Sequence, residues 1–162
     1  MKKILFTLAL LVSFNFFGQS KEAINYYNLG GEFYNIMASA EPKLDEMTYD
    51  EVYEKSYDYY SKAIEINANY EQAYYFRALL QHNFGSNYYG AISDSSRAIE
   101  LNPDDSDYFS LRAISKIALK DYKSAIDDYT KAISVNPLNP WYWKGRAELK
   151  QKLGNNEGAL SD

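Results

Sequence analysis

Few side chains in this sequence could carry out catalytic or metal chemistry. His82 is the sole histidine, and the chain of 162 residues has no cysteine, so thiolate nucleophiles, disulfides and cysteine zinc sites are excluded. Asp104, Asp105 and Asp107 lack the central glycine and terminal glutamate of a calcium loop, and no glycine motif for phosphate occurs. We therefore expect no catalytic residue, no cofactor and no metal, and a protein that is not an enzyme.

Charged residues of two types recur at matched places. Each arginine has an aspartate further along the chain: Arg77 has Asp94, Arg112 has Asp128, and Arg146 has Asp162. An upstream segment has Leu29 and Tyr59 at the corresponding places, so both charges are missing together. We predict that each arginine pairs with the aspartate that follows it; independent solvated charges are the alternative. In either case these residues have a structural role.

The spacing of these charges belongs to a longer repeat. Residues 121–137, DYKSAIDDYTKAISVNP, resemble residues 87–103, NYYGAISDSSRAIELNP, in their alanines, one acid and the final Asn-Pro. Upstream of each segment a small residue follows an aromatic by four positions. The small residues are Gly30, Ala78, Ala113 and Ala147, and the aromatics are Tyr26, Tyr74, Phe109 and Trp143. Small residues at fixed spacing let two helices approach closely, and proline ends each unit. The pattern predicts paired helices.

This repeat resembles the tetratricopeptide repeat, whose signature combines W-x2-L-G-x2-Y, A-x3-F and a final proline. Segment YYNLGGEF supplies Tyr26, Leu29, Gly30 and Phe33 in that order, and Ala125, Tyr129 and Pro137 supply the second half. The resemblance implies an all-α fold, a right-handed solenoid of about three and a half helix–turn–helix repeats. We place the repeat domain at 21–162, with repeats at about 23–69, 71–105, 106–139 and 140–162, the last one incomplete.

Two departures from the repeat affect its ends. The first copy has about fourteen extra residues between its helices, near Pro42, where we expect a loop or an extended helix end. In the fourth copy only residues 156–162 remain for the second helix. We expect them to be too few to cover Trp143, Leu149 and Leu153. The first reading is a truncated sequence, and the alternative is an association surface that another chain completes.

The first twenty residues differ from the rest. MKKILFTLALLVSFNFFGQS places two lysines before an apolar run of about fourteen residues, the layout of a secretory signal peptide and short for a membrane span. We therefore expect a signal peptide at 1–20 and a protein exported to the periplasm, the cell exterior or the bacterial envelope. An uncleaved anchor is the alternative. The formal net charge of −5 gives little reason to bind nucleic acid or an anionic membrane.

In tetratricopeptide-repeat proteins, ligands usually lie in a concave groove lined by the first helix of each repeat. Transferred to this sequence, the resemblance predicts a partner-binding groove that includes Tyr27, Tyr34, Gln72, Tyr75, Leu79, His82, Ser110, Ile114, Trp141 and Lys144. The family's clamp for acidic chaperone tails uses basic residues. Its matching sites here are Tyr27, Gly31, Phe76, Asp107 and Leu111, none of which is basic. Capture of an acidic tail is therefore not expected.

These observations favour a non-enzymatic module that binds a protein or peptide partner and no small-molecule substrate. Tyrosine and tryptophan suit such a surface because they offer large contact area and a polar tip. Two alternatives stay open: a carbohydrate-binding module that uses the groove aromatics, and self-association through the incomplete C-terminal repeat. The fold does not identify the partner, since one scaffold supports many recognition functions.

Overall fold

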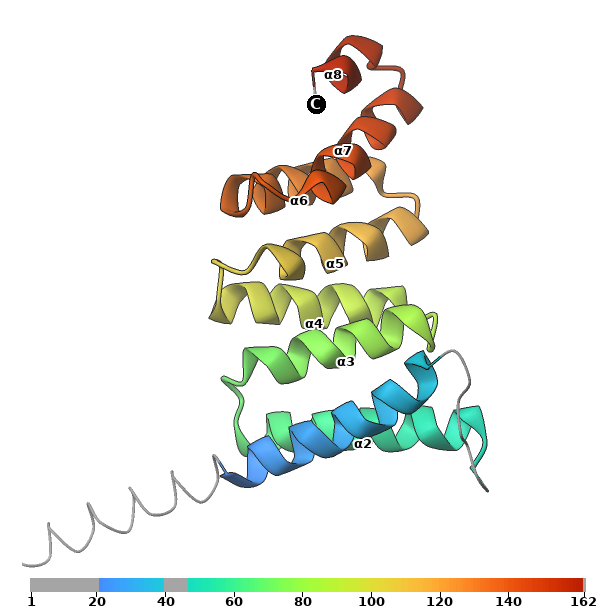
Figure 1. Ribbon diagram of the computed structural model, residues 1–162, viewed down its shortest axis with the longest axis vertical. Helices are drawn as coiled ribbons and strands as arrows, with labels where there is room; N and C mark the ends of the chain where they lie inside the picture. Colours follow the sequence, from blue (N-terminus) through green and yellow to red (C-terminus); the bar gives the residue numbers. More distant parts are fainter. Residues whose placement is uncertain (1–20, 40–46, 162) are drawn as a thin grey trace, which may run out of the picture. The chain divides into compact units, whose positions relative to one another are not determined.

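The computed structural model describes residues 21–39 and 47–161, and every regular element within them is an α-helix (Figure 1). The all-α, helix–turn–helix fold predicted from the sequence is confirmed. The predicted signal peptide at 1–20 and residue Asp162 lie outside the described residues. The chain divides into two compact units, an N-terminal unit up to Ala73 and a C-terminal unit from Tyr74.

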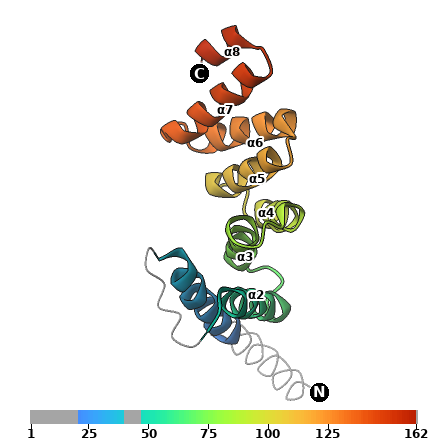
Figure 2. The same cartoon turned by 90° about the vertical axis from the view of Figure 1, so that its right-hand side faces the viewer.

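The N-terminal unit contains a helix over residues 21–38, helix α2 at Tyr49–Ile66 and the start of helix α3 at Glu71–Asn83. Thr48 begins α2 with a capping box, in which its hydroxyl accepts from the Glu51 amide and the Glu51 carboxylate accepts from the Thr48 amide. The helix over 21–38 lies alongside α2 in both views (Figures 1 and 2).

A glycine allows the close approach of these two helices. A Cβ atom at Gly30 would stand 2.9 Å from the ring of Tyr60, a side chain that is fully buried. Ser56 adds a hydrogen bond from its hydroxyl to the Gly30 carbonyl at 2.8 Å. Gly30, which the sequence predicted to lie at a close contact between helices, therefore lies at one.

The C-terminal unit contains the rest of α3, then α4 at Tyr88–Leu101, α5 at Ser106–Ala118, α6 at Tyr122–Val135, α7 at Pro140–Lys152 and α8 at Asn156–Leu160. Successive helices from α4 to α8 pack on one another in chain order, as Figure 2 shows. The core between α5, α6 and α7 is built from the predicted alanines and aromatics. Its buried members are Phe109, Ala113, Ala125, Tyr129, Ala132, Ile133, Tyr142 and Leu149.

The turns inside the helix pairs use the same chemistry each time. The residue that precedes the second helix caps it with a side-chain oxygen: Asn87 to the Gly90 amide, Asp121 to Ser124 and Asn155 to Gly158. One residue before each cap, the backbone is left-handed, with φ of 48° at Ser86, 63° at Lys120 and 83° at Gly154. This conformation turns the chain sharply enough for the second helix to return along the first.

The expectation that α8 leaves Trp143, Leu149 and Leu153 uncovered was wrong for Leu149 but holds for Leu153. Leu149 is only 5% exposed, because it turns into the α5–α6–α7 core. Trp143 is half-buried and Leu153 is 45% exposed. Helix α8 ends at Leu160, which is 89% exposed.

Candidate functional site

The first helices of the C-terminal unit present a half-buried apolar surface. Tyr75 and Leu79 of α3 and Ile114 of α5 pack against the buried cluster of Ala78, Ala91 and Leu111 while remaining partly exposed. Tyr75 also meets the buried ring of Tyr108, with centroids 5.0 Å apart. Ser110, the remaining predicted lining residue of α5, is partly exposed as well. We call Tyr75, Leu79, Ser110 and Ile114 the apolar strip.

Helix α7 adds an exposed aromatic to this surface. Trp141 is 70% exposed although it is a large apolar side chain. The Lys144 ammonium lies 5.4 Å from the centroid of its indole and 3.8 Å from the Glu148 carboxylate. Trp141, Lys144 and Glu148 therefore follow one face of α7, as i, i+3 and i+7 spacing requires.

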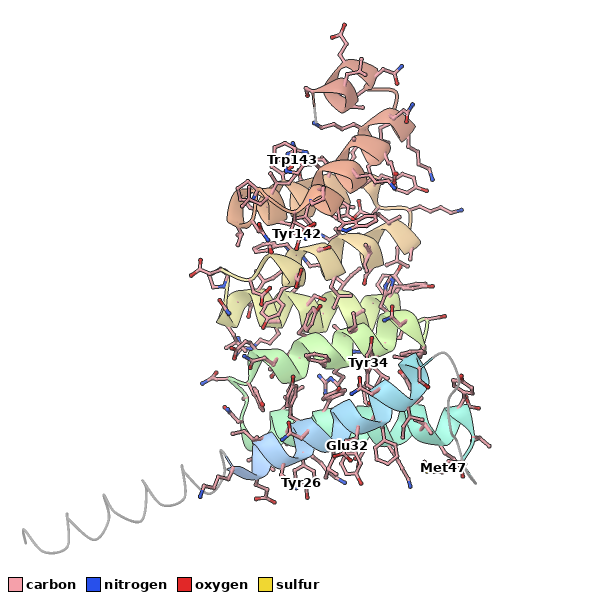
Figure 3. The ribbon with its side chains drawn as sticks, in the orientation of Figure 1. Tyr26, Glu32, Tyr34, Met47, Tyr142 and Trp143 are labelled. Atoms are coloured by element: carbon pink, nitrogen blue, oxygen red, sulfur yellow. The ribbon has the colours of Figure 1, made fainter. Side chains whose placement is uncertain are left out.

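The start of α7 is fixed to the start of α5 by a tyrosine that the sequence did not single out. Tyr142 is 3% exposed, and its hydroxyl donates to Asp107 Oδ1 at 2.6 Å and lies 3.1 Å from Ser106 Oγ. Burial, and then the bond to Asp107, raise the pKa of Tyr142. Tyr142 and Trp143 extend to opposite sides of α7 (Figure 3). Tyr142 thus joins the start of α7 to Asp107, whose side chain is exposed.

His82 is held by a buried serine. Its Nδ1 lies 3.0 Å from Ser115 Oγ, and the Ser115 hydroxyl donates to the Leu111 carbonyl at 2.9 Å. Because that hydroxyl proton is used, the serine oxygen accepts from Nδ1–H of the neutral imidazole. The ring also meets Tyr88 edge-on at 5.4 Å, and burial lowers the His82 pKa. The histidine makes a structural hydrogen bond between α3 and α5.

Three predicted groove residues belong to the N-terminal unit. Tyr27 packs its ring 6.0 Å from that of Tyr60 and 5.1 Å from that of Tyr70, and burial raises its pKa. Tyr34 and Gln72 are partly exposed. Because Tyr27 packs against neighbouring tyrosines, we assign the candidate ligand surface to residues of the C-terminal unit.

The structure brings two of the three predicted charge pairs together. Arg77 donates to Asp94 through Nε and Nη2, both at 2.8 Å, and Arg112 donates to Asp128 at 3.0 and 2.6 Å. The aspartates are 7% and 3% exposed, so both pairs stand inside the helix stack. Asp162 lies outside the described residues; its predicted partner Arg146 donates to Thr130 at 3.1 Å and lies over the Trp143 ring.

Each aspartate has a further donor that sequence reasoning missed. Gln81 donates to Asp94 at 2.6 Å, and Lys116 pairs with Asp128 at 2.7 Å. Gln81 and Lys116 occupy equivalent places on α3 and α5, so aligning the repeats could have predicted a second donor to each aspartate. The alignment did not reveal it because the two residues differ in type. In the N-terminal unit, where both charges are absent, Tyr59 stacks on Tyr26 at 6.1 Å instead.

The C-terminal end of the unit is hollowed between α7 and α8. One hollow, of about 620 Å³, is lined by Pro140, Trp143, Lys144, Ala147 and Ser161. An adjoining one of about 320 Å³ shares Lys144 and Ala147 and reaches Leu160. On α7 the places equivalent to Leu79 and Ile114 hold Glu148, a charged residue. The charged side chains Lys144 and Glu148 therefore lie beside the apolar lining of this end.

Comparison with known proteins agrees with this architecture. Residues 107–137 match the family model described as tetratricopeptide repeat. Among curated proteins, no sequence matches the chain. The chain therefore contains a tetratricopeptide repeat at α5 and α6, the helices that the family model covers.

Solved structures share the fold at low sequence identity. The first TPR of Spaghetti (RPAP3) bound to the HSP90 peptide SRMEEVD is 19% identical, with a TM-score of 0.71 over 83% of this chain and 95% of that one. The Arabidopsis OM64 TPR domain is 17% identical, with a TM-score of 0.70 over 83% and 98%. MamA from Desulfovibrio magneticus RS-1 is 14% identical, with a TM-score of 0.71 over 86% and 70%. At these identities the likeness concerns the fold.

Proposed function

We propose that this protein is a non-enzymatic interaction module that holds an extended segment of a protein partner on the first helices of its C-terminal unit. The observation that carries the proposal is Trp141, a tryptophan that is 70% exposed at the start of α7. Such a ring gives large contact area at low entropic cost, which suits a binding surface. The structural neighbour described as bound to an HSP90 peptide supports peptide binding as a use of this fold.

The side chains around this surface have structural partners rather than catalytic ones. His82 bonds a fully buried serine, and Asp94 and Asp128 bond arginines within the helix stack. A nucleophile and base within reach of one substrate position would be needed for acyl or phosphoryl transfer. These residues support binding as the function.

We also propose that the chain is exported. The support is the sequence of residues 1–20, with two lysines before an apolar run, which is the layout of a signal peptide. In the part of the chain that the structure describes, no helix is both long and apolar enough to span a bilayer. Expression of the full chain in a bacterial host, followed by cell fractionation and N-terminal sequencing, tests export: retention of Met1 on a cytoplasmic product would contradict it.

The binding surface is tested by peptide selection. A random peptide library displayed on phage is selected on the purified chain, and the enriched peptides are measured on Tyr75→Ala, Trp141→Ala and Tyr89→Ala. Tyr89 is a matched control, because it is a 76%-exposed aromatic on the second helix α4. We expect the first two changes to weaken binding about tenfold or more, as loss of a hot-spot aromatic does, and the control to leave it unchanged. Equal binding by all variants would place the ligand elsewhere.

The same variants separate the alternatives. A carbohydrate would also stack on Trp141, so binding on a glycan array that Trp141→Ala removes would favour the sugar-binding role over the peptide role. Association through the α7–α8 end would bury Lys144 and Glu148, two charged side chains that are 63% and 64% exposed. Desolvating such charges is unfavourable unless each is paired, which disfavours association of a further copy at this end. Light scattering at rising concentration tests the point.

A further inference from the structure

The charges beside Trp141 give the candidate surface a definite sign. Lys144 lies 3.8 Å from Glu148, so these two groups largely neutralise one another. Asp107, at the start of α5, has no cation beside it among the described residues; the group that bonds it is the neutral Tyr142 hydroxyl. Asp107 therefore gives the start of α5 a negative charge that no ion pair among the described residues compensates.

The Asp107 carboxylate can accept more hydrogen bonds than it receives. Tyr142 engages Oδ1 at 2.6 Å, and within the described residues Oδ2 is left to solvent. A carboxylate has about four lone-pair sites on its two oxygens, and a guanidinium can bond both oxygens at once. Tyr142 also fixes the carboxylate, so an incoming cation meets an acceptor that is already oriented.

Trp141 favours the same kind of ligand. The face of an indole attracts cations, and it is the best of the three aromatic side chains for this contact. Lys144 lies over the Trp141 ring at 5.4 Å, so a ligand cation would use the other face of this 70%-exposed indole. Tyr142 joins the two helix starts, so the start of α7, which carries Trp141, is held to the start of α5, which carries Asp107.

We propose that the segment bound on this surface is cationic, with an arginine or lysine that stacks on Trp141 and pairs with Asp107. This inference rests on the proposed function and adds the chemistry of the partner to it. It commits to a protein segment, because the apolar strip of Tyr75, Leu79 and Ile114 continues from this point and suits the side chains that flank the cation. The charge is the opposite of that in the acidic peptide SRMEEVD held by the structural neighbour.

The test uses matched synthetic peptides with the whole chain. SRMEEVD and the basic peptide SRMRRVR, in which arginine replaces each acidic residue, carry a fluorescent label and are titrated with the protein at low and at physiological salt. We expect the basic peptide to bind at least about tenfold more tightly, with a preference that falls as salt rises. Equal affinities, or tighter binding of the acidic peptide, would overturn the proposal.

Substitutions assign the preference to the named residues. Asp107→Asn keeps an acceptor for Tyr142 but removes the charge, and we expect it to reduce the preference for the basic peptide about fivefold to tenfold. Asp127→Asn is the control, since it removes an equal charge from an exposed site on α6. If the two substitutions had equal effects, the preference would come from the net charge of the chain. That result would overturn the assignment to Asp107.

This outcome is distinguishable from failure of the proposed function. The library selection described above reports the sequences that the surface prefers without any assumption about charge. If the enriched peptides depend on Trp141 but are neutral or acidic, the binding function stands and the cationic preference is wrong. If no peptide depends on Tyr75 or Trp141, both are wrong.

Discussion

Arg112 and Asp128 form a two-point salt bridge between α5 and α6, with Nε–Oδ2 at 3.0 Å and Nη2–Oδ1 at 2.6 Å. The carboxylate is almost fully buried, and Lys116 reaches the same Oδ2 at 2.7 Å. Arg112 also donates to Ser96 of α4 at 3.1 Å. One guanidinium therefore connects three successive helices, and the paired geometry compensates for taking its partner out of water.

Breaking this pair should strongly destabilise the fold. Because Asp128→Ala leaves two cations without their shared carboxylate, we expect a loss of about 3–5 kcal/mol in the free energy of unfolding. Arg112→Ala should cost less, since Lys116 stays with the carboxylate. A double-mutant cycle followed by urea denaturation measures the coupling. The control cycle is Arg97 with Glu100, an exposed pair for which we expect a coupling of at most about 1 kcal/mol. Equal couplings in the two cycles would contradict the role given to burial.

Two adjacent glycines should respond in opposite ways to the same change. Gly30→Ala would place a methyl group 2.9 Å from the buried Tyr60 ring, an overpacking that typically costs about 1–3 kcal/mol. Gly31→Ala would meet only the Tyr60 hydroxyl, at 3.8 Å, and should stabilise the helix by about 0.5–1 kcal/mol through its better propensity. Thermal melting of the two variants measures the difference. A stabilised Gly30→Ala variant would show that the helix over 21–38 and α2 are not in close contact at this point.

His82 should make stability depend on pH. Burial lowers its pKa below the ordinary 6.5, so the unfolded chain binds the proton more readily than the folded one. Stability is therefore fully present above the unfolded pKa and declines as the pH falls below about 6.5. His82→Asn keeps a donor for Ser115 and removes the titration. Urea denaturation between pH 8 and 5 should show a smaller loss for this variant than for the natural chain, and identical profiles would count against the burial of His82.

The repeat pattern predicted the helices and their contacts because stacking depends on residue size. Gly30, Ala78 and Ala113 are all buried, as a close helix approach demands, and that property can be seen in the sequence as a missing side chain. The burial of Leu149 could not be predicted from the sequence in this way. An apolar residue on a helix can turn to either of two neighbours, and which one it meets depends on the crossing angle rather than on spacing.

The candidate site was predictable in its aromatics but not in its polar contacts. Trp141 was assigned to the binding surface from its place in the repeat, and it is exposed there. Tyr142 was not, because the equivalent places hold Ala73 in one repeat and Tyr108 in the next, so the tyrosine recurs in only two repeats. A hydroxyl that meets a carboxylate from another helix, as Tyr142 meets Asp107, is a tertiary contact that no local pattern encodes. His82 was placed on the groove, whereas its ring is engaged with Ser115 and Tyr88.

Helix α7 should owe its stability to the preceding helix pair and little to α8. Leu149 is 5% exposed in the α5–α6–α7 core, whereas Leu160 of α8 is 89% exposed. Leu149→Ala should therefore lower the free energy of unfolding by about 2–5 kcal/mol, because it removes buried methyl groups and leaves a cavity. Leu160→Ala, the matched control, should change it by about 0.5 kcal/mol or less, as surface substitutions usually do. Urea denaturation followed by tryptophan fluorescence measures both, since both tryptophans of the chain lie in α7. A large effect of Leu160→Ala would mean that α8 covers more of the unit than its exposure indicates, and the α7–α8 end would then need a different description.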